Sequence, residues 1–183
     1  MSFISFIDYA AASPAARREW DDQVQRNGRV THMKQTLLHS AAVFRVYQEW
    51  YTLSGLLLPV IGERGVALFS YAISFGQRCL VCSLFFRKQL VEWGEDPDSP
   101  KLSDKERLLV EFGTAISRAP HDVPSELYAR LSAQFTDEQK VLLVGFAGIM
   151  VATNFFNTVA RVPPDALLEP YLTDVIRGFE HVE

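Results

Sequence analysis

The sequence predicts an all-α protein, on the strength of three observations. Between residues 33 and 58, apolar side chains recur at steps of three and four, which is the spacing of one face of a helix. Residues 103–106 and 136–139 each have the pattern of a capping box, with Ser or Thr three residues before Glu or Gln. No Asn-Gly or Asp-Gly pair separates two alternating apolar stretches, so the evidence for β-hairpins is poor.

The bulk composition fits one globular domain and excludes two classes of partner. The chain has 183 residues, of which 48% are hydrophobic, so it can bury a substantial core. Its formal net charge is -4, which provides no basic field to attract nucleic acid or an anionic membrane surface. We therefore expect no nucleic-acid partner and no membrane partner.

We divide the chain into an N-terminal arm, residues 1–30, and a helical domain, residues 31–183. The arm joins an apolar cluster at residues 3–9 to a charged stretch at residues 17–29. It either packs on its own domain or reaches a neighbouring subunit, and the sequence leaves both alternatives open. The arm begins without the charged segment of a signal peptide, so a cytoplasmic protein is expected.

The first half of the domain predicts three helices. In chain order they cover residues 33–58, 63–75 and 77–93. Pro59 and Gly62 end the first helix, and Gly76 ends the second, because these residue types interrupt helices. A loop-like composition, rich in Pro and Asp, follows the third helix over residues 94–100.

The second half predicts four more helices. They cover residues 103–117, 125–134, 137–162 and 165–179. The capping boxes mark two of their starts, and Pro163 with Pro164 stops the long apolar helix. Residues 141–160 form an uncharged run near the roughly 20 residues that can span a bilayer, but its Asn, Thr and Gly residues favour a buried core helix.

A weak internal similarity suggests a repeated helix pair. A shift of about 75 residues aligns the two most apolar helices, and it places Cys79 on Asn154 and Cys82 on Asn157. A few matches between two apolar helices also arise by chance. An internal repeat and chance similarity therefore both remain open.

Cys79 and Cys82 form a C-x-x-C motif at the expected start of a helix. Residues three apart share a helix face, and free N–H groups with the positive end of the helix dipole favour a thiolate there. Arg78 adds a neighbouring positive charge, which lowers a thiol pKa further. A thiolate attacks a peroxide or a disulfide, and a second thiol resolves the product as an internal disulfide. The motif thus predicts two catalytic cysteines, with Arg78 as the thiolate-activating residue.

Other interpretations of these residues compete with catalysis. Two cysteines also pack as small apolar residues in buried helices. A zinc site needs two further ligands. His32 and His39, seven residues apart, could share a helix face, but ordinary polar placement of the histidines is favoured, so we predict no metal and no cofactor. Asn154 and Asn157 lie in an apolar helix, where they either tie helices together or, with Phe86, line a pocket beside the thiols.

Three segments carry a resemblance to a known family. They read GERGVALFSYAISFGQRCLVCSLFFRKQL, LSDKERLLVEFGTAIS and FTDEQKVLLVGFAGIMVATNFFNTVARVPPD, at residues 62–90, 102–117 and 135–165. In their order, and in the helix that leads through a short break into C-x-x-C, they resemble the alkylhydroperoxidase D / carboxymuconolactone decarboxylase family. The likeness is to its peroxidase-related branch and covers roughly residues 33–168.

The resemblance implies an all-α AhpD-like fold, no metal, and dimers, trimers or hexamers of the chain. It implies thiol-dependent reduction of hydroperoxides, with Cys82 as the peroxidatic thiol and Cys79 as the resolving thiol. Two positions depart from the family pattern, which has a relay His where this chain has Phe86 and a relay Glu where it has Ala67. Because a positioned proton relay contributes typically 10²–10⁴-fold in rate, the resemblance implies a weak peroxidase.

Three functions follow from these observations. The first is a weak thiol peroxidase or oxidoreductase that uses Cys79 and Cys82, acts on a hydroperoxide and is served by a thiol-reducing protein. The second is a redox-inactive relative that binds a small apolar ligand or a partner, which the missing relay favours. The third, a decarboxylase of the carboxymuconolactone type, needs a pocket of converging polar groups. In each case we expect a homo-oligomer, because small helical domains often bury a face in a symmetric partner.

Overall fold

The computed structural model describes residues 2–180 of the chain, and within that range the secondary structure is helical throughout. The elements are η1 (Tyr9–Ala11), α1 (Pro14–Asn27), α2 (His32–Leu37), α3 (Ala41–Gly76), α4 (Leu80–Glu92), α5 (Asp104–Arg118), α6 (Ser125–Gln134), α7 (Asp137–Val159), η2 (Ala166–Tyr171) and α8 (Leu172–Glu180). The expected all-α class is confirmed for these residues.

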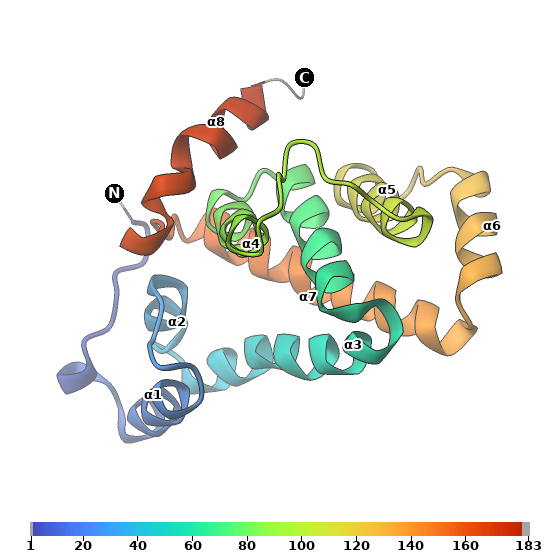
Figure 1. Ribbon diagram of the computed structural model, residues 1–183. Coiled ribbons are helices and arrows are strands. Elements are labelled where there is room, and N and C mark those ends of the chain that lie inside the picture. Colours follow the sequence, from blue (N-terminus) through green and yellow to red (C-terminus); the bar gives the residue numbers. More distant parts are fainter. Residues whose placement is uncertain (1, 181–183) are drawn as a thin grey trace.

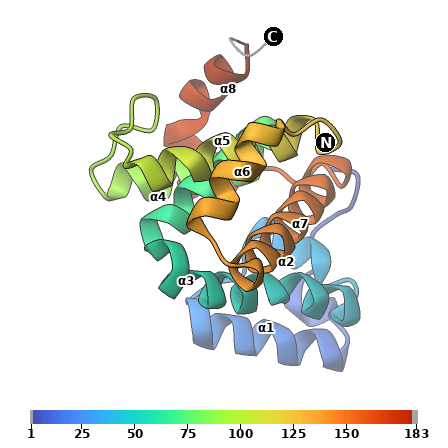
Figure 2. The ribbon, with the colours of Figure 1, turned by 90° about the vertical axis from the view of Figure 1, so that its right-hand side faces the viewer.

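Helix α3 is the centre of the arrangement, and α4, α5 and α7 pack against it (Figure 1). Phe69 on α3 is fully buried, and its ring stacks on Phe112 of α5 and Phe146 of α7, with centroids 6.0 and 6.2 Å apart. One aromatic side chain therefore joins the three longest core helices. Turned by 90°, the same ribbon shows α1 running beneath the first part of α3 (Figure 2).

The expected single helix over residues 33–58 is wrong. The chain forms the short helix α2, ends it at Leu37, and starts α3 at Ala41. Ser40 causes the break, because its extended backbone and its hydroxyl, which accepts the N–H of Val43, make it an N-cap. The predicted interruption near Gly62 is present as a kink inside α3, where Gly62 adopts a positive φ of 72°.

The last predicted helix also differs from the structure. Residues 166–171 form the 3₁₀ helix η2, and the α-helix α8 begins only at Leu172. Pro170 lies inside η2 and has no N–H to donate, so a continuous α-helix from residue 165 is disfavoured. Near the end of α8, Phe179 packs on Phe75 of α3, with ring centroids 5.0 Å apart.

The N-terminal arm lies on its own domain in this chain. Ala12 and Ala16 of the arm pack with Leu37, Leu38 and Phe44 in a second, smaller cluster. The amide of Phe3 also donates a hydrogen bond of 3.0 Å to the carbonyl of Ala160. The boundary at residue 30 stays a prediction.

Helix α7 buries one face and exposes the other, which is also apolar. Val141, Val144, Phe155 and Val159 are each more than half exposed. Helices α3 and α7 are both long and apolar enough to cross a membrane by length and composition alone, and in this structure they pack against each other. The expected homo-oligomer stays a prediction.

The ends of α3 and α7 share one backbone motif. Arg78 and Arg161 both follow a helix end with a positive φ, 53° and 52°. The next amide in each case, of Cys79 or Val162, reaches back to a carbonyl in the last helical turn. These two turns are not spaced by the 75 residues that the sequence alignment suggested, so the repeat remains unconfirmed.

Phe69 should be the most sensitive core position. Phe69→Ala removes a fully buried ring from between three helices, and we expect it to lower the free energy of unfolding by about 3–5 kcal/mol. Chemical denaturation followed by circular dichroism measures the change. Phe3→Ala is the matched control, because that ring is 72% exposed. Equal losses in both variants would contradict the proposed central role of Phe69.

Candidate functional site

A sharp chain reversal between α3 and α4 forms the candidate site. Arg78 takes the left-handed conformation, and the amide of Cys79 donates a 3.0 Å hydrogen bond to the carbonyl of Ser74. Gly76 is required because a Cβ there would collide with the Ser117 hydroxyl of α5. Helix α4 begins directly after this reversal, at Leu80.

The reversal places both sulfurs at the first turn of α4. Cys79 is the N-cap residue, with extended backbone at φ -79°, and Cys82 is the third residue of the helix. Both are free thiols, and both are buried, at 1% and 6% exposure. They therefore lie where the amide dipoles of a helix start are strongest, but away from bulk water.

The two thiols have opposite tendencies to ionise. The pKa of Cys79 is lowered, first because the Cys82 thiol donates a hydrogen bond to its sulfur, an effect that burial opposes. The amides of Cys82 and Val81 and the hydroxyl of Thr158 favour the thiolate further. The pKa of Cys82 is raised well above its usual value, because its proton is held by Cys79 and because burial disfavours a second charge.

These directions describe one negative charge shared by two sulfurs. When one thiol of the pair ionises, the charge favours Cys79, and the Cys82 thiol keeps its proton. A buried pair that shares a proton titrates as a unit, so the charge can move to Cys82 when the proton moves to Cys79.

Arg78 lies beside the motif in sequence, but its guanidinium points elsewhere. It donates a 2.5 Å hydrogen bond to the carbonyl of Phe179 and borders a separate hollow with Arg118 and Phe75. The pKa shifts of the two thiols arise from hydrogen bonds and burial, without a contribution from this residue. The contact with the Phe179 carbonyl directs this guanidinium toward α8, and the expectation that Arg78 activates the thiolate stays a prediction.

The two asparagines of α7 have different roles in the structure. Asn157 donates from Nδ2 to the sulfur of Cys82, at 3.2 Å, and partly offsets the rise in that thiol's pKa. Its Oδ1 is buried without a partner among the described residues. Asn154 instead accepts a 3.4 Å hydrogen bond from the Ser74 hydroxyl and lies away from the cavity. Asn154 thus ties α7 to α3, whereas Asn157 faces the reactive sulfur.

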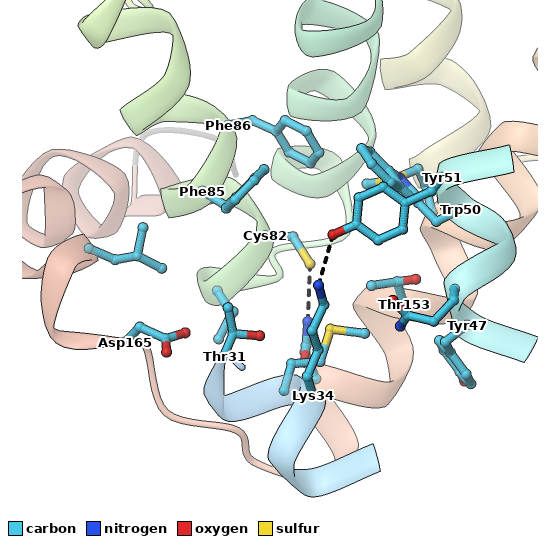
Figure 3. Close-up of a pocket in the computed structure, with 16 residues that line it drawn as sticks. Thr31, Lys34, Tyr47, Trp50, Tyr51, Cys82, Phe85, Phe86, Thr153 and Asp165 are labelled. Carbon is cyan, nitrogen blue, oxygen red and sulfur yellow. Dashed lines mark hydrogen bonds between the residues drawn. The ribbon is translucent and has the colours of Figure 1, made fainter. Parts of the chain in front are cut away.

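A cavity of about 150 Å³ opens in front of Cys82. Phe86 and Trp50 form part of its apolar wall (Figure 3). Met150 and Asn157 also line it. Cys79 is not among the lining residues, so of the two thiols only Cys82 faces this space. An engineered apolar cavity of about the same volume binds benzene, so this space suits a small organic group.

One wall of the cavity carries polar residues that the sequence did not single out. Lys34 of α2 donates from Nζ to the hydroxyl of Tyr51, at 2.8 Å, and both line the cavity (Figure 3). The pKa of Lys34 is lowered to about 8, mainly by burial and also by the charge of Arg29. In the sequence, Lys34 could have been found as a single positive charge, next to Met33, on an otherwise apolar helix face.

The histidines are not brought together. His32 Nδ1 contacts the carbonyls of Pro163 and Pro164, while the ring of His39 contacts the carbonyl of Ser5. Within residues 2–180, no cluster of three or more His, Cys, Asp or Glu side chains is suited to hold a metal ion.

Two solved structures are similar along nearly their whole length. The alkylhydroperoxidase AhpD core of an uncharacterized peroxidase-related protein from Ralstonia eutropha JMP134 gives a TM-score of 0.76 at 17% identity, over 91% of this chain and 94% of that chain. The chain has the AhpD-like fold. A peroxidase-related protein from Silicibacter sp. TM1040, also uncharacterized, gives 0.74 at 14% identity, over 90% and 93%. No protein-family model and no curated protein matches the sequence.

The AhpD-like fold that the motif order predicted is therefore confirmed. At 14–17% identity the likeness extends to the fold and its element order. The relay substitutions at Ala67 and Phe86 are features of this sequence whose consequence stays a prediction. The structure places Ala67 in a buried apolar cluster with Leu68 and Leu90, and Phe86 against Trp50.

The coupling between the thiols can be tested by titration. Cys82→Ala removes the donor that most lowers the pKa of Cys79 while leaving that sulfur buried, so we expect the pKa of Cys79 to rise above its ordinary value. Cys82→Ser is the matched control, because its hydroxyl retains a donor and should keep the pKa low. Thiolate absorbance against pH measures both. An unchanged Cys79 pKa in Cys82→Ala would contradict the shared-proton pair.

Proposed function

We propose that the chain is a thiol-dependent peroxidase that reduces small organic hydroperoxides through Cys82 and Cys79. The observation that carries the proposal is the position of two neighbouring thiols at a helix N-terminus, of which Cys82 faces an apolar cavity. The peroxidase-related names of the two similar structures agree with this reaction class.

The first step activates Cys82 within the pair. The proton of Cys82 passes to the neighbouring Cys79 thiolate, whose formation the lowered pKa of Cys79 favours. The negative charge then resides on the sulfur that faces the cavity, where Asn157 Nδ2 donates to it. Hydrogen bonds to a charged acceptor are the stronger kind, so this amide favours the attacking form.

The second step breaks the peroxide. The Cys82 thiolate attacks the outer oxygen of the hydroperoxide, a sulfur–oxygen bond forms, and the oxygen–oxygen bond breaks. The alkoxide leaves as the alcohol after it takes a proton from solvent. Cys82 is oxidised to a sulfenic acid, and the hydroperoxide is reduced to the alcohol.

The third step closes the disulfide. Cys79 attacks the sulfur of the Cys82 sulfenic acid, water leaves with the Cys79 proton, and an internal disulfide forms. A thiol-reducing protein partner then supplies two electrons and two protons through thiol–disulfide exchange. Both sulfurs lie in one helical turn, so the bond needs no large rearrangement of the chain.

The pair replaces a relay that this chain lacks. Phe86 and Ala67 occupy the positions where the resemblance implies His and Glu, and neither side chain transfers a proton. The Cys79 sulfur is then the nearest base for the Cys82 proton. We expect the reaction to be slow relative to relay-containing peroxidases, by about the 10²–10⁴-fold that a positioned acid–base group contributes.

The roles of the two cysteines separate in single-turnover experiments. We expect Cys82→Ser to reduce hydroperoxide consumption to background, because the remaining sulfur does not line the cavity. We expect Cys79→Ser to react once and stop as a Cys82 sulfenic acid, detected by a sulfenic-acid reagent and intact-protein mass. Full turnover by Cys82→Ser, or a sulfenic acid on Cys79 in the native chain, would reverse the assignment.

Asn157 provides a test that keeps both thiols. Asn157→Leu preserves most of the side-chain volume but removes the donor to Cys82, so we expect the rate of sulfenic-acid formation to fall about tenfold or more. Asn154→Leu is the matched control, because that buried amide bonds Ser74 one helical turn away. Equal rates in the two variants would indicate general destabilisation rather than a role for Asn157 at the sulfur.

One observation favours a second function, the binding of a small apolar ligand without redox chemistry. Cys82 is only 6% exposed, and aromatic rings surround the space in front of it. Two results distinguish the functions. A redox-inactive binder shows no hydroperoxide turnover in the native chain. It also binds its ligand equally well after Cys82→Ser.

A further inference from the structure

The cavity in front of Cys82 contains one cation in an apolar setting. The Lys34 ammonium is half-buried, donates to the Tyr51 hydroxyl at 2.8 Å and lies 5.0 Å from the centre of the same ring. Figure 3 shows its side chain extending from α2 toward Tyr51, in the space that Cys82 also faces. Among residues 2–180, no carboxylate lies within ion-pair distance of Lys34 Nζ.

The nearby charges compensate the Lys34 charge only in part. Asp165 lines the same cavity and its charge raises the pKa of Lys34, but this effect is smaller than those of burial and Arg29, which lower it. The two side chains do not form an ion pair, and Asp165 Oδ1 accepts the backbone N–H of His32 at 3.1 Å, at the N-terminus of α2. Arg29 is a second positive charge near Lys34, and it lowers the pKa of that lysine together with burial. A half-buried cation without an anionic partner favours an anion that enters from solution.

The apolar residues of the cavity wall limit the size and kind of molecule that can carry the anionic group. Trp50, Phe85, Phe86 and Met150 surround a space of about 150 Å³, which suits a ring or a short branched chain rather than a sugar or a nucleotide. Lys34 has three donor hydrogens and shares one with Tyr51, so two remain for an incoming oxyanion. The Tyr51 hydroxyl can donate to the same group.

We propose that Lys34 and Tyr51 form an anion-binding subsite, and that the cavity takes a small apolar molecule that carries one carboxylate. The carboxylate binds Lys34 and Tyr51, and the apolar body packs on the aromatic wall beside Cys82. The inference rests on the proposed peroxidase function for its substrate class, which is then a carboxylate-bearing organic hydroperoxide. Binding of an unreactive carboxylate does not depend on that function.

Binding is measured on the full chain with both cysteines replaced by serine, by ligand-observed NMR titration with benzoate and with benzamide. Benzamide has nearly the same shape but no charge. We expect benzoate to bind about tenfold more tightly or better, because a hydrogen-bonded ion pair replaces a neutral contact. Lys34→Met should remove this preference, whereas Lys140→Met, at the far end of α7, should preserve it.

The preference should also depend on pH. The Lys34 ammonium is protonated below its pKa of about 8, so the preference for benzoate is present below that pH and declines above it. The charged and titratable groups around it are Arg29, Asp165 and Tyr51, and the pKa of Tyr51 is raised by burial. Lys34→Arg stays charged throughout and should retain the preference at high pH.

The outcomes separate this inference from the proposed function. Equal affinity for benzoate and benzamide, or a preference that survives Lys34→Met, overturns the anion subsite whatever the thiols do. Turnover of cumene hydroperoxide and of its ring-carboxylated analogue is compared in the native chain. Absence of turnover with both overturns the peroxidase alone, and a higher kcat/KM for the carboxylated compound that Lys34→Met abolishes supports both.

Discussion

The chemistry of this molecule depends on one backbone feature, the reversal of the chain at Arg78. The left-handed turn ends α3, and the hydrogen bond from the Cys79 amide to the Ser74 carbonyl sets the direction of α4. Because of it, Cys79 is the N-cap of a helix instead of an interior residue, and the amides that stabilise its thiolate are unpaired within the helix. Gly76 permits the close approach of α5 that holds this turn in place.

Much of the fold could be predicted from local signals. Ser103 and Thr136 begin capping boxes that start α5 and α7 where the pattern indicated, and Gly62 interrupts α3 as expected. The errors occurred where a single polar or cyclic residue overrides apolar spacing. Ser40 separates α2 from α3, and Pro170 delays the start of α8. The spacing of apolar residues indicates neither an N-cap nor a missing N–H, so it did not predict these two breaks.

Only part of the candidate site could be predicted from the sequence. Spacing alone placed Cys79 and Cys82 at the start of one helix, but the direction of Arg78 depends on a backbone angle that spacing does not determine. The cavity wall combines Lys34 of α2, Tyr51 of α3 and Cys82 of α4, and only tertiary packing joins such separated residues. Which of the two asparagines faces the sulfur likewise depends on how α7 packs against α3 and α4.

The contact between Asp165 and the amide of His32 has a consequence for folding order. The two residues are 133 positions apart, and their hydrogen bond secures α2, the helix that carries Lys34, to the segment after α7. Closing so long a loop has a large entropic cost that is met only once the intervening helices have condensed. The helix pair that carries the two cysteines consists of neighbours in the chain and can assemble early, so we expect the cysteine motif to form before the cavity in front of it is enclosed.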